Sequence, residues 1–139
     1  MTNTVHAGLY AEIQHFYAAH MQLLDDGRIE EWAAHFTEDG TFATDVHPIP
    51  ARGRAELIAG ARHTIEQLES EGVVRRHWLG MSAVAREEDN LRVRSYALVL
   101  QSTEQGVTVR ASTTCEDVLV PDGPTWLIRE RLVHRDTAP

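Results

Sequence analysis

Hydrophobic positions recur at helical spacing over the first quarter of the chain. One stripe over residues 7–24 predicts an amphipathic helix, and it comprises Leu9, Ile13, Phe16, Tyr17 and Leu24. The "DDGR" segment is expected to end this helix at Gly27. A second, short helix is predicted from Ile29, Trp32, Ala33 and Phe36. A third helix is predicted over residues 54–70, with a hydrophobic face formed by Leu57, Ile58, Ala61, Ile65 and Leu68.

After Gly72 the pattern changes to extended runs. Four runs follow, "VVRRHWLGMSAVA", "LRVRSYALVLQST", "VTVRASTTCEDVLV" and "TWLIRERLVHR", separated by the turn-like segments "REEDN", "EQG" and "PDGP". Consecutive strands joined by short turns pair antiparallel. Before the third helix, "TFATDV" predicts one more extended piece and "HPIPARG" predicts a loop. We therefore predict one α+β domain over residues 1–139, in which a curled antiparallel sheet wraps the helices.

Composition and charge exclude several classes of function. A formal net charge of -8 argues against a nucleic-acid or anionic-membrane surface. No hydrophobic run is long enough to span a bilayer and no signal peptide is recognisable, so we expect a cytosolic protein. All 13 basic residues are arginine, which excludes a lysine Schiff base. The single cysteine, Cys115, excludes an internal disulfide and a cysteine-rich metal site.

The eight histidines separate by their positions in the predicted elements. Four are expected at the surface, because they precede the first helix or lie opposite a hydrophobic face: His6, His15, His35 and His63. His47 lies in a loop and His134 near the end of the last strand, where each could be solvated. His20 and His77 differ, because each lies in an element that faces the core. Each is either a hydrogen-bonded core residue or a catalytic group.

Most carboxylates lie on polar faces or in turns, but four of them are different. Asp25 follows the buried stripe of the first helix, where it either terminates the helix or serves the site. Asp45 closes the "TFATD" piece and could face either way. Glu116 and Asp117 are neighbours in a strand, so one of them faces inward.

Motifs for several other chemistries are absent from the sequence. It contains no HExxH zinc motif, no GxSxG nucleophile motif and no glycine-rich phosphate loop. We therefore expect no metal and no cofactor. General acid–base chemistry by histidine and carboxylate in an apolar cavity is what remains.

Four segments, "YAEIQHFYAAHMQLLDDGRIEEWAAHFTEDGTFATD", "ARGRAEL", "RRHWLG" and "TWLIRERLVHRD", resemble the NTF2-like superfamily. Within it they are most similar to SnoaL-like and scytalone dehydratase-like proteins of bacterial aromatic (type II) polyketide biosynthesis, especially those of the pyran-ring stage in actinorhodin-type clusters. The resemblance covers nearly the whole chain. It implies a cone-shaped α+β fold in which three N-terminal helices pack into a strongly curved sheet around a pocket, and a homodimer formed through the sheet.

The resemblance also implies site residues. A dehydratase histidine in an "HxxG" motif matches His77 in "HWLG", and a dehydratase aspartate at the end of the first helix matches Asp25. The ketosteroid isomerase branch places a tyrosine donor at the position of His20 and a catalytic aspartate near Asp45. The second histidine of scytalone dehydratase falls near Gln101, where this chain departs from the pattern with "QST".

These residues predict dehydration of a β-hydroxy ketone or hemiketal on an aromatic polyketide. His77 takes the proton α to the carbonyl and returns it to the leaving hydroxyl, while Asp25 orients the imidazole. His20, with Tyr17 or Tyr96, stabilises the enolate oxygen by hydrogen bonding.

The aromatic side chains Trp32, Trp78, Phe36 and Phe42 either line the pocket around a flat ring system or pack in the core. Alternatives to the dehydratase remain open: a polyketide cyclase, an epoxide hydrolase of the same fold, and a non-catalytic protein that binds a polyketide intermediate. The departure at Gln101 favours the last of these.

Overall fold

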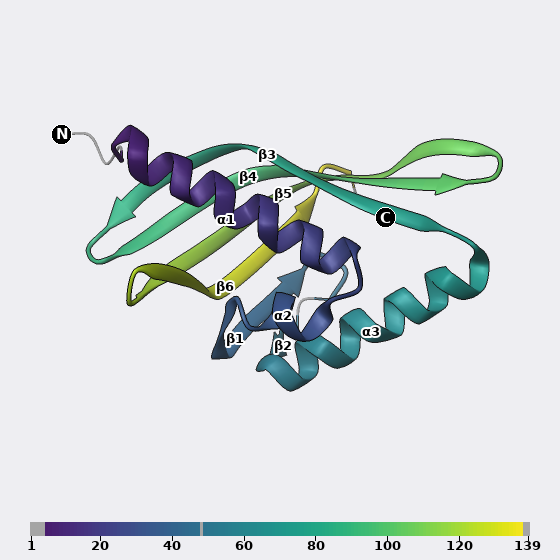
Figure 1. Cartoon of the computed structure of the whole chain (residues 1–139), viewed down its shortest axis with the longest axis horizontal. Coiled ribbons are helices and arrows are strands. Elements are labelled where there is room, and N and C mark those ends of the chain that lie inside the picture. The colour runs from purple at the N-terminus through teal and green to yellow at the C-terminus, as the bar shows by residue number, and fades with distance from the viewer. Residues whose placement is uncertain (1–4, 48, 138–139) are drawn as a thin grey trace.

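The computed structural model describes residues 5–47 and 49–137, and its elements follow the predicted order of helices and then strands (Figure 1). The helices are α1 (Ala7–Asp25), α2 (Ile29–Ala33) and α3 (Arg54–Glu71). The strands are β1 (Phe36–Thr44), β2 (Ala51–Arg52), β3 (Val74–Glu87), β4 (Asn90–Thr103), β5 (Gly106–Asp122) and β6 (Thr125–Arg135). None of the described helices is long and apolar enough to cross a membrane.

The strands form a six-stranded sheet in the order β2-β1-β6-β5-β4-β3. Strands β3 to β6 pair antiparallel in chain order, as predicted from their short turns. The sheet is nevertheless mixed, because β1 pairs parallel with β6. The predicted curved sheet is confirmed, and among the described strands this parallel pair is its one difference from the antiparallel pairing expected. Helix α3 and the strands β2 to β5 separate β1 from β6 in the chain, so no tight turn dictates the direction of that pair.

The first helix follows its predicted hydrophobic stripe. Its buried residues are Leu9, Ile13, Tyr17, His20 and Met21. His6 precedes the helix and accepts a hydrogen bond from the Leu9 amide through Nδ1 at 3.1 Å, so it caps the helix. Gly27 ends the turn after α1 with a φ of 77°, a conformation that is accessible to glycine at little cost.

The core lies between α1 and the curled sheet, with α1 crossing one face of the sheet in Figure 1. Strand β4 shows the alternation that such packing requires, since Leu91, Val93 and Ala97 are buried while Arg92 and Arg94 are exposed. Helix α3 lies beside β1 and β2 at one end of the molecule. This arrangement leaves a space between α3 and the sheet, where the candidate site lies.

The opposite face of the sheet carries exposed hydrophobic side chains. They include Trp78, Met81, Tyr96, Val107 and Val109. A homodimer through the sheet, expected from the resemblance, would cover this face and stays a prediction.

Candidate active site

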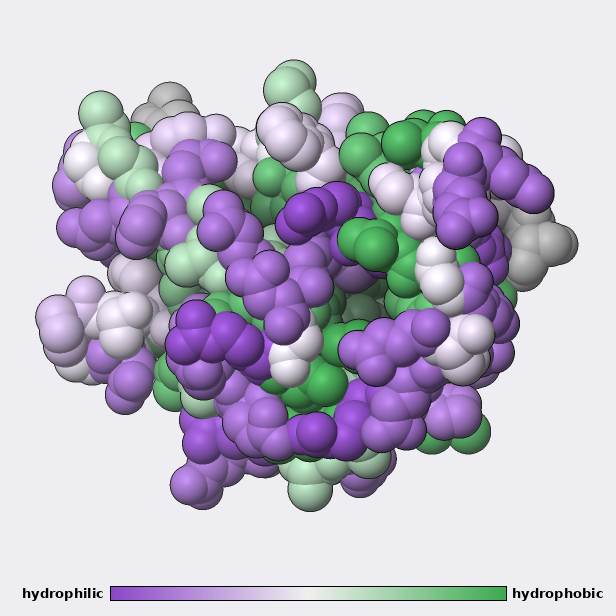
Figure 2. Space-filling model, turned by 45° about the vertical axis from the view of Figure 1, so that its right-hand side comes forward, coloured by the Kyte–Doolittle hydropathy of each residue, from purple (hydrophilic) through white to green (hydrophobic). Residues whose placement is uncertain are grey.

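A cavity of about 770 Å³ opens between α3, the end of α1, β1 and the start of β3. Its hydrophobic lining comes chiefly from the face of α3 that the sequence pattern identified, including Leu57, Ala61, Ile65 and Leu68. Figure 2 shows one face of the molecule hollowed, with hydrophobic side chains inside the hollow and hydrophilic ones around much of its rim. A mostly apolar cavity with a few polar groups is the usual form of a small-molecule site.

His77 and Asp25 both line this cavity and contact each other directly. Asp25 Oδ1 lies 2.6 Å from His77 Nδ1, and Asp25 Oδ2 accepts a hydrogen bond from the His77 backbone amide at 3.0 Å. The side chain of Asp25 is 6% exposed and that of His77 is 27% exposed. The carboxylate is therefore enclosed, while the imidazole remains accessible.

The two contacts define what the histidine can do. An ionised carboxylate only accepts hydrogen bonds, so the neutral imidazole paired with it carries its proton on Nδ1. The unprotonated Nε2 is then free to take a proton from a ligand. The start of β3 packs beside the end of α1, which brings His77 within hydrogen-bond distance of Asp25.

Trp32 and Arg75 also line the cavity. Trp32 is buried, in agreement with either of its predicted roles, since it packs against Phe36 and also forms part of the wall. Gln101 does not line the cavity, but its Oε1 accepts a hydrogen bond from Arg75 Nε at 2.8 Å. His47, which the sequence left open, lies at the cavity with the loop before α3.

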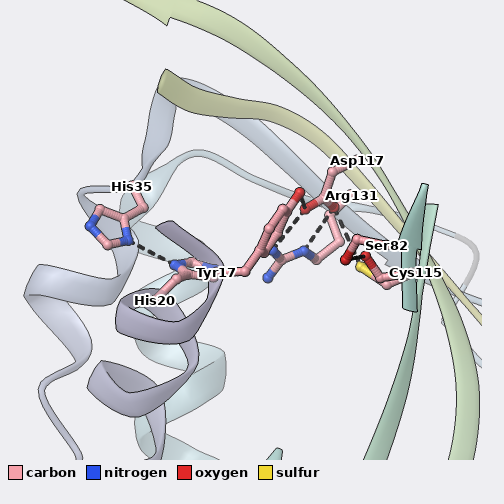
Figure 3. Close-up of polar contacts among 8 residues, drawn as sticks. Tyr17, His20, His35, Ser82, Cys115, Asp117 and Arg131 are labelled. Carbon is pink, nitrogen blue, oxygen red and sulfur yellow. Dashed lines mark hydrogen bonds and ion pairs between the residues drawn. The ribbon is translucent and has the colours of Figure 1, made fainter. Parts of the chain in front are cut away.

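Tyr17 lies in a buried polar network instead of the cavity (Figure 3). Its hydroxyl donates to Asp117 Oδ2 at 2.7 Å, and Arg131 donates to both oxygens of Asp117 at 2.9 Å. The alternation argument was right that one of Glu116 and Asp117 faces inward, and Asp117 is the one. Burial and the Asp117 charge raise the pKa of the Tyr17 hydroxyl well above its usual value. Tyr17 is thus held as a structural hydrogen-bond donor.

His20 is fully buried and does not line the cavity. Its Nδ1 lies 2.9 Å from Nδ1 of His35 (Figure 3). Its ring stacks on both Phe16 and Trp32. The prediction of His35 as a surface residue was wrong, because the chain turns sharply after α2 and directs this side chain toward α1.

The pKa of His20 lies well below its usual value, through burial first and then through the positive charges of Arg131 and His35. Burial and the charge of Arg131 also lower the pKa of His35. Two histidines in contact, each with a lowered pKa, form a neutral pair in which one Nδ1 donates and the other accepts.

Three more predicted site residues lie away from the cavity. Asp45 is exposed, and it accepts hydrogen bonds from His134 Nδ1 and the Arg135 amide, both at 2.8 Å. Trp78 is 70% exposed and Tyr96 is 49% exposed, both on the outer face of the sheet. Strand alternation explains the positions of Trp78 and Tyr96, because Trp78 neighbours the inward-facing His77 and Tyr96 lies between the buried Ser95 and Ala97.

Sequence reasoning did not find the buried partner of Asp117. In β6 the buried residues Ile128 and Arg131 are three apart, whereas a regular strand would place them on opposite faces. The register explains this spacing: Val118 pairs with Glu130 and Leu119 pairs with Ile128, so Arg129 is an extra residue in a bulge. No signal in the sequence marks that bulge.

The described residues form no evident metal-binding site. Within residues 5–47 and 49–137, no three His, Cys, Asp or Glu side chains converge in a group that could hold a metal ion.

Comparisons with known proteins place these features in a family. Residues 6–132 match the SnoaL-like domain. ActVI-ORFA from Streptomyces coelicolor is 33% identical, with 96% of this chain and 99% of that chain covered and a TM-score of 0.88. Aln2 from a Streptomyces species is 28% identical, with coverage of 96% and 94% and the same TM-score.

A protein from Catenulispora acidiphila, solved in complex with S-DNPA, is 38% identical, with coverage of 94% and 96% and a TM-score of 0.82. A comparison with curated protein sequences gave no match. The helices packed against a curled sheet and the match over residues 6–132 agree with the resemblance seen in the sequence. The chain belongs to the SnoaL-like family and has the NTF2-like fold.

Proposed function

We propose that the protein is a cofactor-independent acid–base enzyme of aromatic polyketide tailoring, which dehydrates a β-hydroxy ketone or hemiketal at the pyran-ring stage. The observation that carries the proposal is the contact of His77 with Asp25 at the wall of a largely apolar cavity. The similarity to ActVI-ORFA supports the polyketide assignment. The complex of the Catenulispora acidiphila relative with S-DNPA supports a small-molecule ligand.

The proposed reaction uses one proton donor and acceptor, His77. Nε2 takes the proton from the carbon α to the carbonyl, and the electron pair forms the new double bond as the C–O bond to the leaving hydroxyl breaks. The resulting imidazolium returns the proton to that hydroxyl, which departs as water. Asp25 keeps the Nδ1 proton in place and stabilises the imidazolium by its negative charge.

The role first expected for His20, Tyr17 and Tyr96 is not part of this proposal. None of the three lines the cavity, and the hydroxyl of Tyr17 is already bonded to Asp117. The contacts of Asp25 also bear on the epoxide hydrolase alternative. Both of its oxygens are bonded to His77, which leaves Asp25 poorly placed to activate a water by itself.

Mass spectrometry of the purified protein with a hydroxylated aromatic polyketide ketol or hemiketal tests the proposal. A product lighter by one water, formed by the wild type and by His63→Gln but not by His77→Gln, is the expected result. His63 is a matched control because it is exposed on α3 and does not line the cavity.

Other products would replace this proposal with another one. An isomer of unchanged mass would identify a cyclase, and a product heavier by one water would identify a hydrolase. Saturable binding with no conversion would identify a binding protein. Full dehydration by His77→Gln would contradict the proposed role of His77.

A further inference from the structure

Arg75 shares the cavity face of β3 with His77. Along this part of the strand, Arg75, His77 and Leu79 are partly buried, while Val74, Arg76 and Trp78 are exposed. Residues two apart on one strand face place their Cα atoms about 6.6 Å from each other. Arg75 is the one arginine, among the described residues, that lines the cavity, so its charge lies beside the proposed catalytic histidine.

Gln101 holds the guanidinium of Arg75 from the neighbouring strand. The two residues are direct partners in the β3–β4 register, and Arg75 Nε donates to Gln101 Oε1 at 2.8 Å. This contact leaves the two terminal nitrogens of the guanidinium, which together match the two oxygens of a carboxylate. Over residues 5–47 and 49–137, no carboxylate of the chain lies within ion-pair distance of Arg75.

The charges around Arg75 leave its positive charge largely uncompensated. Burial lowers the pKa of Arg75, the nearby Arg110 lowers it further, and Glu71 opposes them as the smallest of these three effects. Three carboxylates line the cavity: Asp25 is bonded to His77, Glu56 accepts a hydrogen bond from the Arg52 amide, and Glu69 lies beyond ion-pair distance of Arg75. A bound anion would supply the compensation that the chain itself does not.

We propose that Arg75, positioned by Gln101, is an anion-binding subsite that takes a carboxylate of the substrate. The proposed substrates are therefore aromatic acids. Their carboxylate is bound by the two terminal guanidinium nitrogens of Arg75, and this places the reacting carbon near His77. The inference rests on the proposed function for the reaction, but the binding step is independent of turnover. It also gives Gln101 a role as a positioning residue at the place where scytalone dehydratase has its second histidine.

Calorimetric titration with two aromatic probes tests the subsite without any turnover. The probes are β-naphthylacetate and its neutral amide, β-naphthylacetamide, which differ only in the carboxylate. A charge-assisted contact to Arg75 is expected to make the wild type bind the acid about 10- to 100-fold more tightly than the amide. Arg75→Gln should remove this preference and leave amide binding unchanged.

Arg76→Gln is the matched control, because Arg76 is the adjacent arginine and is exposed on the other face of β3. This variant should keep the full preference for the acid. Gln101→Leu should lower the preference for the acid without changing amide binding. A general loss of packing would instead weaken the binding of both probes. Equal affinities of the wild type for the two probes, no saturable binding of the acid, or an undiminished preference in Arg75→Gln would overturn the proposal.

The His77→Gln variant separates this inference from the proposed function. Retained preference for the acid in His77→Gln, together with no dehydration by the wild type, would refute the reaction and leave the subsite standing. Dehydration of neutral and acidic substrates with equal KM would support the reaction and refute the subsite.

Discussion

His20 and His35 face each other through their Nδ1 atoms at 2.9 Å, with Phe16 packed against both rings and Trp32 stacked on His20. A hydrogen bond between two such atoms requires that one imidazole nitrogen donate and the other accept. If both rings were protonated, neither Nδ1 could accept and two positive charges would meet near Arg131. The pair therefore stabilises the fold only while it is not doubly protonated.

We predict a loss of stability as the pH falls below about 6.5, the usual pKa of an unfolded histidine. The lowered pKa of folded His20 means that the unfolded chain binds more protons in this window. The free energy of unfolding then decreases by up to about 1.4 kcal/mol per pH unit for His20, and the contribution is complete above the window. Urea unfolding between pH 7.5 and pH 5.5, about one unit on each side of that pKa, measures it.

The slope of stability against pH should become shallower in His20→Gln, whatever that variant does to the absolute stability. His15→Gln is the control, because His15 is exposed on the same helix. Asp45 and Glu87 have lowered pKa values, so the stability that these carboxylates contribute is lost at more acidic pH, outside this window. An unchanged slope in His20→Gln would contradict the prediction.

Asp25→Asn should lower kcat by about 10²- to 10⁴-fold with little change in KM. An amide can accept through only one atom, so it cannot serve both the His77 amide and Nδ1 as the carboxylate does. It also removes the negative charge that stabilises the imidazolium. Steady-state dehydration kinetics would measure the effect, with Asp26→Asn as the exposed neighbouring control. Wild-type kcat in Asp25→Asn would be evidence against a catalytic pair.

The sequence predicted the elements that carry the site better than it predicted which side chains meet there. Hydrophobic periodicity indicated the cavity-lining face of α3, and the resemblance indicated His77 and Asp25 before their contact was seen. The pairing of β1 with β6 was missed because it joins strands that are distant in the chain. Periodicity also failed for Arg131, because the bulge at Arg129 reverses the alternation of β6.

The same limit applies to His35. Its position opposite the hydrophobic face of α2 predicted exposure, but α2 ends at Ala33 and the side chain belongs to the turn that follows. The position of a residue just beyond a helix depends on how the next strand leaves it. A helical projection carries no information on that point.

Arg131→Met should lower the free energy of unfolding by about 3–5 kcal/mol, because it leaves the buried carboxylate of Asp117 without its partner. The two side chains are 2% and 1% exposed. Replacing both, as Arg131→Met with Asp117→Asn, should cost less than Arg131→Met alone, since no unpaired charge is then buried. Chemical denaturation compares the variants.

Arg92→Gln is the control for the buried pair, because Arg92 forms an exposed pair with Glu87. This change is expected to alter the free energy of unfolding by less than about 1 kcal/mol. An equal cost for Arg131→Met and Arg92→Gln would show that burial does not determine the strength of these pairs.

Tyr17→Phe should reduce stability but leave dehydration unaffected. The substitution removes a buried hydroxyl that donates to Asp117 Oδ2 at 2.7 Å, and the loss of a hydrogen bond to a charged group costs about 1.5–3 kcal/mol. Because Tyr17 does not line the cavity, kcat and KM of the folded variant should match the wild type. Chemical denaturation and steady-state kinetics on one preparation separate the two effects. A large fall in kcat with unchanged stability would instead return Tyr17 to the enolate-stabilising role that its place on the first helix suggested, and would require the cavity to extend to that helix face when substrate is bound.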